Sequence, residues 1–284
     1  MTLSGPVLLV GAGRMGGAMI DGWLSQGVPP ERLLAVVPSE ERRAALADKG
    51  VQAVAAPEAL PADLVPSVVV LAVKPQKMDA VLPAYARFAG PETVFLSVAA
   101  GRTVASLTRH LGAHAAVVRS IPNTPSAVGR GMTVLYANEQ VSEAQRAACD
   151  TLLQGVGATG WVADENLMDA ATAVSGSGPA YVFHMIEALA RAGVEAGLPD
   201  GLAARLALNT VAGAGELARQ SAEDPTTAPT TLRRNVTSPG GTTEAALREL
   251  MGNEDPADAQ GGGLSALLAR AVAAATARSR ELAG

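Results

Sequence analysis

Residues 6–16 read PVLLVGAGRMG, and this stretch decides the fold. A short apolar run of strand length leads directly into a G-x-G-x-x-G turn, and apolar residues then recur at helical spacing. In a strand–turn–helix unit of this kind, Gly11 allows the sharp turn and Gly13 lets a pyrophosphate approach the backbone. Gly16 lets the helix pack on the strand. The stretch therefore predicts a dinucleotide-binding turn at the start of a doubly wound α/β domain.

Further apolar runs predict a mainly parallel sheet. The runs 68–73 (VVVLAV) and 93–98 (TVFLSV) are nearly unbroken, as expected for strands that helices cover on both faces. Polar or glycine-rich turns follow them at residues 74–75 and 99–101, where open α/β sheets bind ligands. Other strands are predicted at residues 33–37, 115–119, 133–136 and 158–162, with a helix at residues 142–153. We predict an α/β, Rossmann-type domain over residues 1–163.

Residues 164–284 show a different pattern, with long Ala- and Leu-rich helical periods and no further clear strand. This pattern predicts a second, all-helical domain. Its apolar faces exceed what one small bundle can bury, which indicates an extensive homo-oligomer interface.

Composition excludes several classes of partner. The net charge is −5 and no Lys/Arg cluster occurs, which argues against binding to nucleic acid or to an anionic membrane surface. No window approaches 18 uninterrupted apolar residues, so no membrane span is predicted. The single cysteine, Cys149, has no partner for an internal disulfide, as is usual in a reducing compartment. We expect a soluble cytoplasmic protein that binds a small molecule.

The second predicted strand bears on cofactor choice. An acidic residue that would bind the ribose of NAD is absent about twenty residues after the glycines. Ser39, Arg42 and Arg43 stand there instead, and guanidinium groups match the geometry of a 2′-phosphate. This favours NADPH, with NADH as an open alternative. The arginines could also lie on a solvated helix face beside Glu40 and Glu41.

Residues 235–247 read NVTSPGGTTEAAL and are suited to hold a carboxylate. Ser238, Thr242 and Thr243 carry hydroxyl groups, and two glycines, of which Gly241 is the second, allow a ligand to approach the backbone. A helix is predicted to begin here, and the free N–H groups of its first turn attract an anion. The same residues are also compatible with a simple turn and helix N-cap.

Other candidate sites are weaker. His110, His114 and His184 are scattered, so no metal site is predicted. Ser175 and Ser177 precede a helix and are expected to cap it, since a nucleophile elbow needs G-x-S-x-G between a strand and a helix. The scarcity of titratable groups fits hydride chemistry, in which the nicotinamide supplies the reactive atom. A protonated imine accepts hydride directly, and a threonine hydroxyl could orient it.

The chain resembles the pyrroline-5-carboxylate reductase family. The motifs GAGRMG, LAVKPQ, SVAAG, IPNTP, AVSGSGPAYVF, AGVEAGLP and VTSPGGTT carry this resemblance over nearly the whole sequence. It implies NAD(P)H-dependent reduction of L-1-pyrroline-5-carboxylate to L-proline, the last step of proline biosynthesis. It also implies an N-terminal Rossmann domain and a helical domain that interlocks with that of a partner subunit. Such dimers can assemble further, often into decamers.

The resemblance also assigns residues. The cofactor would be lined by Val10, Gly11, Ala12, Gly13, Arg14, Met15, Ala72, Val73, Lys74, Val98, Ala99 and Ala100. The substrate would be bound by Asn235, Ser238, Gly241, Thr242 and Thr243. Thr243 would be the catalytic hydroxyl near the ring nitrogen. Because this loop can approach the cofactor of the neighbouring subunit in the family, the site would require the dimer.

Two departures from the family pattern affect these assignments. Residues 51–67 contain no Asn, although the family often has a cofactor-contacting Asn there, and this segment is lengthened. The choice between NADPH and NADH depends most on this difference. Residues 221–231 are also longer than usual, so the family's acidic substrate residue maps to either Glu223 or Asp224.

Two other functions are compatible with the sequence. The first is reduction of a different cyclic imine, such as a piperideine carboxylate or 1-pyrroline-2-carboxylate, since one methylene changes binding by only about 1–3 kcal/mol. The second is a non-catalytic dinucleotide sensor, against which the intact VTSPGGTT stretch argues. A hydroxyacid dehydrogenase would need a Lys or His general acid in the helical domain, and no convincing candidate is found.

Overall fold

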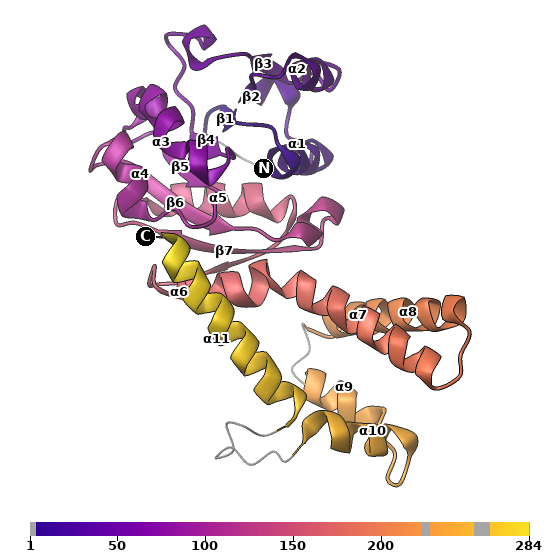
Figure 1. Ribbon diagram of the computed structural model, residues 1–284. Coiled ribbons are helices and arrows are strands. Elements are labelled where there is room, and N and C mark those ends of the chain that lie inside the picture. Colours follow the sequence, from indigo (N-terminus) through magenta and orange to yellow (C-terminus); the bar gives the residue numbers. More distant parts are fainter. Residues whose placement is uncertain (1–3, 223–227, 253–261, 284) are drawn as a thin grey trace. The chain divides into compact units, whose positions relative to one another are not determined.

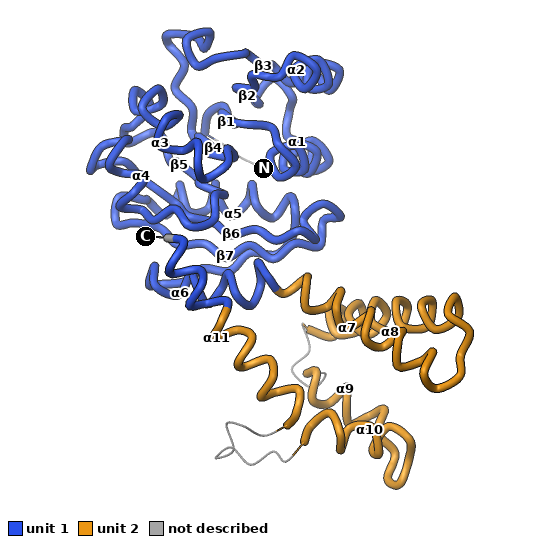
Figure 2. The backbone as a smooth tube through the Cα atoms, viewed as in Figure 1, with its two compact units in different colours: residues 1–177, 275–284 blue, residues 178–274 orange. Residues whose placement is uncertain are grey.

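The computed structural model describes residues 4–222, 228–252 and 262–283 (Figure 1). The chain divides into two compact units, shown in different colours in Figure 2. Unit 1 consists of Met1–Ser177 and Ala275–Gly284, and unit 2 consists of Gly178–Ala274. The helix α11 (Leu264–Ala283) begins in unit 2 and ends in unit 1.

Unit 1 is built on one eight-stranded sheet with the order β3-β2-β1-β4-β5-β6-β7-β8. The strands are β1 (Val7–Val10), β2 (Leu33–Val36), β3 (Gln52–Val54), β4 (Val68–Leu71), β5 (Val94–Ser97), β6 (Ala116–Ile121), β7 (Gly131–Ala137) and β8 (Gly157–Trp161). Neighbouring strands are parallel except β6 and β7. The strand order reverses at β1 and β4, where doubly wound sheets bind their ligands. The predicted fold class is confirmed.

The strand β3 is absent from the sequence prediction. It has only three residues, Gln52, Ala53 and Val54, and it pairs with β2 at the edge of the sheet. None of the three is fully buried, so the segment lacks the apolar run that marks the inner strands. Part of the segment that the sequence shows as lengthened therefore widens the sheet.

Helices cover both faces of the sheet. They are α1 (Arg14–Ser25), α2 (Glu40–Ala47), α3 (Met78–Val81), α4 (Val104–Leu111), α5 (Glu143–Gln154) and α6 (Leu167–Ala171). Successive residues of a strand point to opposite faces, so Val7 and Leu9 join a core with α1 and α5. Leu8 and Val10 join the other core, with α3 and α4. This burial on both faces explains the unbroken apolar strands.

A buried tryptophan ties two helices together beneath the sheet. Trp23 of α1 is fully buried, and its indole Nε1 donates a hydrogen bond of 2.7 Å to the carbonyl oxygen of Leu152 in α5. Burial of a large aromatic ring with its one polar atom satisfied contributes strongly to stability. The contact fixes α1, and with it the glycine turn at the start of α1.

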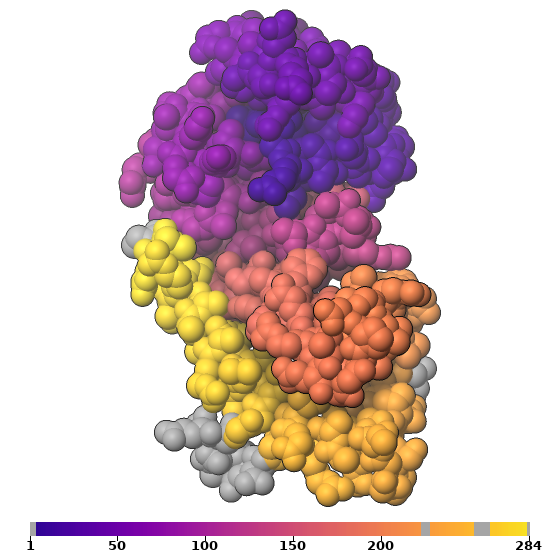
Figure 3. Space-filling model, turned by 45° about the vertical axis from the view of Figure 1, so that its right-hand side comes forward, coloured from indigo at the N-terminus to yellow at the C-terminus, as the bar shows by residue number. Residues whose placement is uncertain are grey.

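Unit 2 contains α7 (Gly178–Glu195), α8 (Asp200–Gln220), α9 (Pro229–Asn235), α10 (Thr242–Met251) and the first part of α11. None of the 18 residues of α7 is buried, and in α8 only Ala203 and Ala207 are buried. Large apolar side chains of both helices, including Phe183 and Leu208, are more than half exposed. Figure 3 shows the surface of this part of the chain. So large an apolar surface is typical of a subunit interface.

Among the described residues, no helix has the length and apolar character needed to cross a membrane. The predicted domain boundary at residue 163 follows β8 directly, whereas the compact units divide after Ser177. The limits 1–163 and 164–284 stay a prediction.

Candidate functional site

Three glycines of the turn between β1 and α1 have three different structural roles. Gly11 has φ +90°, and an added Cβ would lie 3.0 Å from the carbonyl oxygen of Ala72. An added Cβ on Gly16 would lie 2.4 Å from the carbonyl oxygen of Gly11, so only glycine fits there. At Gly13 an added Cβ would meet nothing within 4 Å. The fold does not need glycine at residue 13, and the open space above it is left for a ligand.

The same turn forms an anion-binding helix terminus. Gly13 is the N-cap of α1, and its residue type offers no side chain to occupy the free N–H groups of the first turn. The helix spans 12 residues, and the positive end of its dipole faces the turn. A pyrophosphate would be stabilised at this position by the N–H groups and the dipole together.

The structure brings the turns after three neighbouring strands together. Ala72 donates its backbone N–H to the carbonyl oxygen of Val10 at 2.9 Å, and Val98 donates to Leu71 at 3.2 Å. These bonds extend the ladders β1–β4 and β4–β5 beyond the strands. The residues assigned to the cofactor at the carboxyl ends of β1, β4 and β5 thus lie side by side. They are Val10, Gly11, Ala12, Gly13, Arg14, Met15, Ala72, Val73, Lys74, Val98, Ala99 and Ala100.

The arginines after β2 differ in their contacts. Ser39 caps α2, and its Oγ accepts a hydrogen bond from the N–H of Arg42 at 3.4 Å. The Nη1 of Arg42 donates to the carbonyl oxygen of Ala12 at 3.1 Å, which places this guanidinium at the glycine turn. Arg43 instead donates to the carbonyl oxygens of Val37 and Pro38, at 2.9 and 2.7 Å. Arg42 therefore reaches the glycine turn, whereas Arg43 is hydrogen-bonded to the backbone just after β2.

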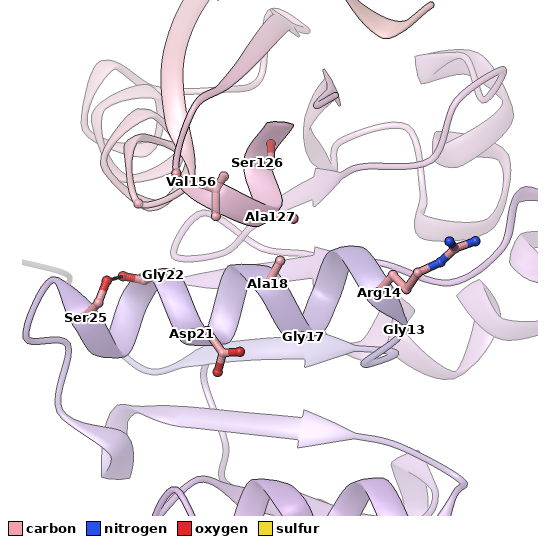
Figure 4. Close-up of a pocket in the computed structure, with 12 residues that line it drawn as sticks. Gly13, Arg14, Gly17, Ala18, Asp21, Gly22, Ser25, Ser126, Ala127 and Val156 are labelled. Atoms are coloured by element: carbon pink, nitrogen blue, oxygen red, sulfur yellow. Dashed lines mark hydrogen bonds between the residues drawn. The ribbon is translucent and has the colours of Figure 1, made fainter. Parts of the chain in front are cut away.

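A groove of about 550 Å³ runs along α1 (Figure 4). It contacts the glycine turn only at Gly13 and Arg14, and then follows the helix to Ser25. In Figure 4, Ala127 and Val156 lie across the groove from α1, and the side chain of Arg14 points away from them. The groove thus follows the flank of α1, whereas a dinucleotide would cross the ends of the strands.

A second cavity, of about 560 Å³, lies within unit 1 beside the turn after β5. Its lining includes Gln76, Ala100, Arg102, Thr172 and Arg278, and none of its lining residues is acidic. Ala100 is one of the residues assigned to the cofactor. The cavity therefore adjoins one of the predicted cofactor residues.

One wall of this cavity is held by a charged cluster. The guanidinium of Arg102 contacts both carboxylate oxygens of Asp79, and the Nε2 of His110 lies 2.9 Å from the same carboxylate. The hydrogen bonds from Arg102 are the main reason that the pKa of Asp79 is lower than usual. Asp79 is exposed, so these ion pairs contribute little to the stability of the fold.

The hydroxyl-rich loop of unit 2 joins α9 to α10. Asn235 is the last residue of α9, and Thr242 and Thr243 are the first two residues of α10. Gly241 is the N-cap of α10 and accordingly provides no side-chain cap. The N–H groups of the first turn of α10 therefore remain available to an anion.

Hydrogen bonds within the loop set its shape. Gly241 donates its N–H to the carbonyl oxygen of Ser238 at 3.0 Å, and Gly240 has φ +70°. The N–H of Gly240 donates to the Oε2 of Glu244 at 2.6 Å. Ser238 is exposed and Thr243 is half-buried, so both side chains are accessible. Glu223, the other residue assigned to the substrate, and its alternative Asp224 lie outside the described residues.

Other reactive groups have structural roles. Burial raises the pKa of the Cys149 thiol above its ordinary value, so this group is not a thiolate nucleophile. Ser175 was expected to cap a helix, but the structure shows that it does not. It lies in a π-helical turn (Thr172–Gly176), where its Oγ donates to the carbonyl oxygen of Met132 at 3.3 Å and Asn123 donates to its carbonyl oxygen at 3.1 Å. Within the described parts of the chain, no cluster of three His, Cys, Asp or Glu side chains is suited to a metal.

Comparison with known families gives two matches. Residues 165–282 match the family described as "Pyrroline-5-carboxylate reductase dimerisation". Residues 6–101 match "NADP oxidoreductase coenzyme F420-dependent". The first match covers the helices with the exposed apolar faces and the loop before α10, and the second covers β1 to β5. A family defined by dimerisation accounts for the apolar surface of α7 and α8, so the chain self-associates.

Individual relatives agree with these matches. The pyrroline-5-carboxylate reductase of Pseudomonas aeruginosa is 43% identical, with 98% of this chain and 96% of the relative covered. That of Synechocystis sp. is 40% identical, with 96% and 97% covered.

Solved structures agree as well. A pyrroline-5-carboxylate reductase from Coxiella burnetii matches with a TM-score of 0.88 at 32% identity over 99% of both chains. A Plasmodium falciparum pyrroline carboxylate reductase with NADP bound matches with a TM-score of 0.76 at 28% identity, also over 99% of both. This chain belongs to the pyrroline-5-carboxylate reductase family.

Proposed function

We propose that this protein reduces L-1-pyrroline-5-carboxylate to L-proline, the last step of proline biosynthesis. The observation that carries the proposal is the 43% identity with the Pseudomonas aeruginosa reductase over 98% of this chain. That span includes both the glycine turn of unit 1 and the hydroxyl-rich loop of unit 2. No observation favours reduction of another cyclic imine, or a protein that binds the cofactor without turnover.

The residues at the carboxyl ends of β1, β4 and β5 fit a nicotinamide dinucleotide. The space over Gly13 would be filled by any Cβ, and the N-terminus of α1 faces it. Residues 10–15, 72–74 and 98–100 would line the cofactor from pyrophosphate to nicotinamide. When bound, the reduced cofactor supplies the hydride that reduces the C=N bond of the imine. The chain's own residues then have to bind, orient and desolvate the substrate.

The loop before α10 is suited to the substrate. Ser238, Gly241, Thr242 and the first-turn N–H groups of α10 would hold the substrate carboxylate, with Asn235 nearby on α9. The Thr243 hydroxyl would accept a hydrogen bond from the ring N–H of the protonated imine and so fix which carbon faces the hydride. As hydride reaches that carbon, the C=N electron pair moves to nitrogen, which already carries its proton. No separate general acid is then required.

We infer a preference for NADPH from the contacts of Ser39 and Arg42. The guanidinium of Arg42 already reaches the glycine turn, and the hydroxyl of Ser39 lies at the N-terminus of α2. A 2′-phosphate between them would receive charge-assisted hydrogen bonds and the favourable end of a helix dipole. NADH lacks this phosphate, so it would bind more weakly.

Replacing Arg42 with alanine is expected to reduce selectivity for the phosphorylated cofactor. The KM for NADPH should rise roughly 10- to 100-fold, the usual effect of losing a hydrogen bond to a charged group, while the KM for NADH changes little. Arg43→Ala is the comparison, since Arg43 donates to the backbone carbonyl oxygens of Val37 and Pro38 and its loss should affect both cofactors equally. Equal losses with both cofactors in the Arg42 variant would contradict the assignment.

The assembly and location are also proposed. We infer that the self-association is a homodimer, which the unburied helix α7 supports, and that dimers assemble further, up to a decamer. The loop before α10 would then meet the cofactor of a neighbouring subunit. A cytoplasmic location is proposed from the single cysteine, which is free and buried.

The proposed reaction is tested by following loss of reduced-nicotinamide absorbance with L-1-pyrroline-5-carboxylate. We expect rapid oxidation of NADPH, slower oxidation of NADH, and proline as the product. A piperideine carboxylate and 1-pyrroline-2-carboxylate are assayed in parallel. A clear preference for either of these imines would replace the proposed substrate. Binding of NADPH without oxidation by any imine would indicate a sensor.

A further inference from the structure

An ion pair between the buried Arg119 and the half-buried Glu165 lies close to the turn that carries Ala99 and Ala100. Arg119 is a charged residue in the middle of β6, all six residues of which are buried, and it is only 6% exposed. Its Nη1 donates to the Oε1 of Glu165 at 2.5 Å. A buried guanidinium requires such a partner because its desolvation is otherwise uncompensated. Sequence reasoning did not identify either residue, although a charge inside an apolar strand is a signal of this kind.

The carboxylate of Glu165 makes a second contact. The same Oε1 atom accepts the backbone N–H of Val104 at 2.8 Å. Val104 is the first residue of α4, and a carboxylate at a helix N-terminus is favoured by the free N–H groups and the dipole. Glu165 itself directly precedes Asn166, the N-cap residue of α6. One oxygen therefore joins β6 to the beginning of α4.

This contact fixes the downstream end of the turn between β5 and α4. The turn comprises residues 98–103 and includes the cofactor positions Ala99 and Ala100. Its upstream end is also held from β6, since the Oγ of Ser120 donates to the carbonyl oxygen of Ser97 at 2.9 Å. Two consecutive residues of β6 thus hold the two ends of the turn. Ser120 holds the upstream end directly, and Arg119 holds the downstream end through Glu165.

We propose that Arg119 and Glu165 are positioning residues for the cofactor. They act through the N–H of Val104, and they keep the turn 98–103 in the shape that receives the nicotinamide. Neither residue needs to touch the cofactor. This inference rests on the proposed function, because it concerns the turn assigned to the nicotinamide. Its expected signature is a change in cofactor binding and turnover that exceeds any change in stability.

Glu165→Gln tests the proposal with a small change of shape. The neutral amide loses the charge-assisted hydrogen bond to Arg119, so its oxygen is no longer held in place at the N–H of Val104. We expect NADPH affinity and kcat/KM to fall about 10- to 100-fold, as when a reacting group is displaced by a fraction of an ångström to about one ångström. NADPH affinity is measured directly, from the fluorescence of the bound cofactor without imine, and the melting temperature is recorded for each protein.

Glu143→Gln is the matched control. Glu143 also stands in the first turn of a helix, α5, and lies 3.8 Å from Arg146, but its side chain is 96% exposed and remote in sequence from the turn. We expect this variant to bind NADPH and to turn over like the natural protein. Arg119→Lys is the second test, since it keeps the charge but not the planar fork, and it should lose less affinity than Arg119→Met.

The outcomes distinguish a positioning role of the ion pair from a merely structural role. If Glu165→Gln and Arg119→Met lower the melting temperature but bind NADPH and turn over normally at lower temperature, the pair is merely structural and the proposal fails. Should Arg119→Met not fold, the comparison of Glu165→Gln with Glu143→Gln decides alone. If the natural protein itself binds no NADPH, the proposed function fails instead. Reduced NADPH affinity at an unchanged folded fraction supports the positioning role.

Discussion

Gly13→Val is expected to remove dinucleotide binding and leave the fold intact. Gly13 has φ −72° and ψ −163°, an extended conformation that valine adopts without strain. Apart from its chain neighbours, no atom lies within 4 Å of the position of its Cβ, so the added Cβ has no steric conflict there. It would, however, occupy the space through which a pyrophosphate approaches the N-terminus of α1. We expect NADPH affinity to fall at least about 100-fold, or ~2.8 kcal/mol.

Two neighbouring glycines provide the controls for this experiment. Gly17 also has nothing within 4 Å of its Cβ position, but it lies inside α1 and faces the groove along the helix. Gly17→Ala should keep NADPH binding and stabilise the protein by roughly 0.5–1 kcal/mol. Gly16→Ala would place a methyl group 2.4 Å from the carbonyl oxygen of Gly11, and should destabilise the fold by about 1–3 kcal/mol. Normal NADPH affinity in Gly13→Val would contradict the cofactor assignment.

The features that the sequence predicts well are local ones. The turn at Gly11 to Gly16 and the inner strands depend on residues adjacent in the chain, whose spacing and apolar runs already specify their conformation. The edge strand β3 was missed because exposure on one side removes the apolar run. The π-helical turn at Ser175 was also missed, since it depends on Asn123, 52 residues earlier.

The pairing of Arg119 with Glu165 cannot be predicted from the sequence pattern. The two residues are 46 positions apart, and the sequence around each residue does not indicate which residue is its partner. The charge of Arg119 inside a strand indicates that some partner exists, but the choice of Glu165 follows from how β6 and the segment before α6 are packed. The site residues depend on packing in the same way. Gly241 and Thr243 occupy a helix N-terminus that local turn chemistry predicts, whereas the cofactor site that this loop is proposed to meet would depend on assembly of the subunits.

Replacing Thr243 with valine is expected to abolish most turnover without affecting the cofactor. Valine has nearly the shape of threonine and keeps the β-branch, so the first turn of α10 should retain its conformation. Thr243 is half-buried and is the second residue of this helix, beside the N–H groups proposed to hold the substrate carboxylate. Loss of its hydroxyl leaves the imine N–H without its acceptor, and the ring can rotate away from the hydride. We expect kcat/KM to fall about 100-fold.

Direct binding measurements distinguish this effect from damage to the cofactor site. NADPH affinity should be nearly unchanged in Thr243→Val, because the Thr243 hydroxyl is proposed to contact the imine nitrogen and not the cofactor. Thr243→Ser restores the hydroxyl without the methyl group and should recover most of the turnover. Thr230→Val, an exposed threonine of α9, controls for loss of a hydroxyl in the same unit. If Thr243→Val turns over like Thr230→Val, the ring nitrogen is oriented by another group, and the backbone N–H groups of α10 become the main determinant of substrate binding.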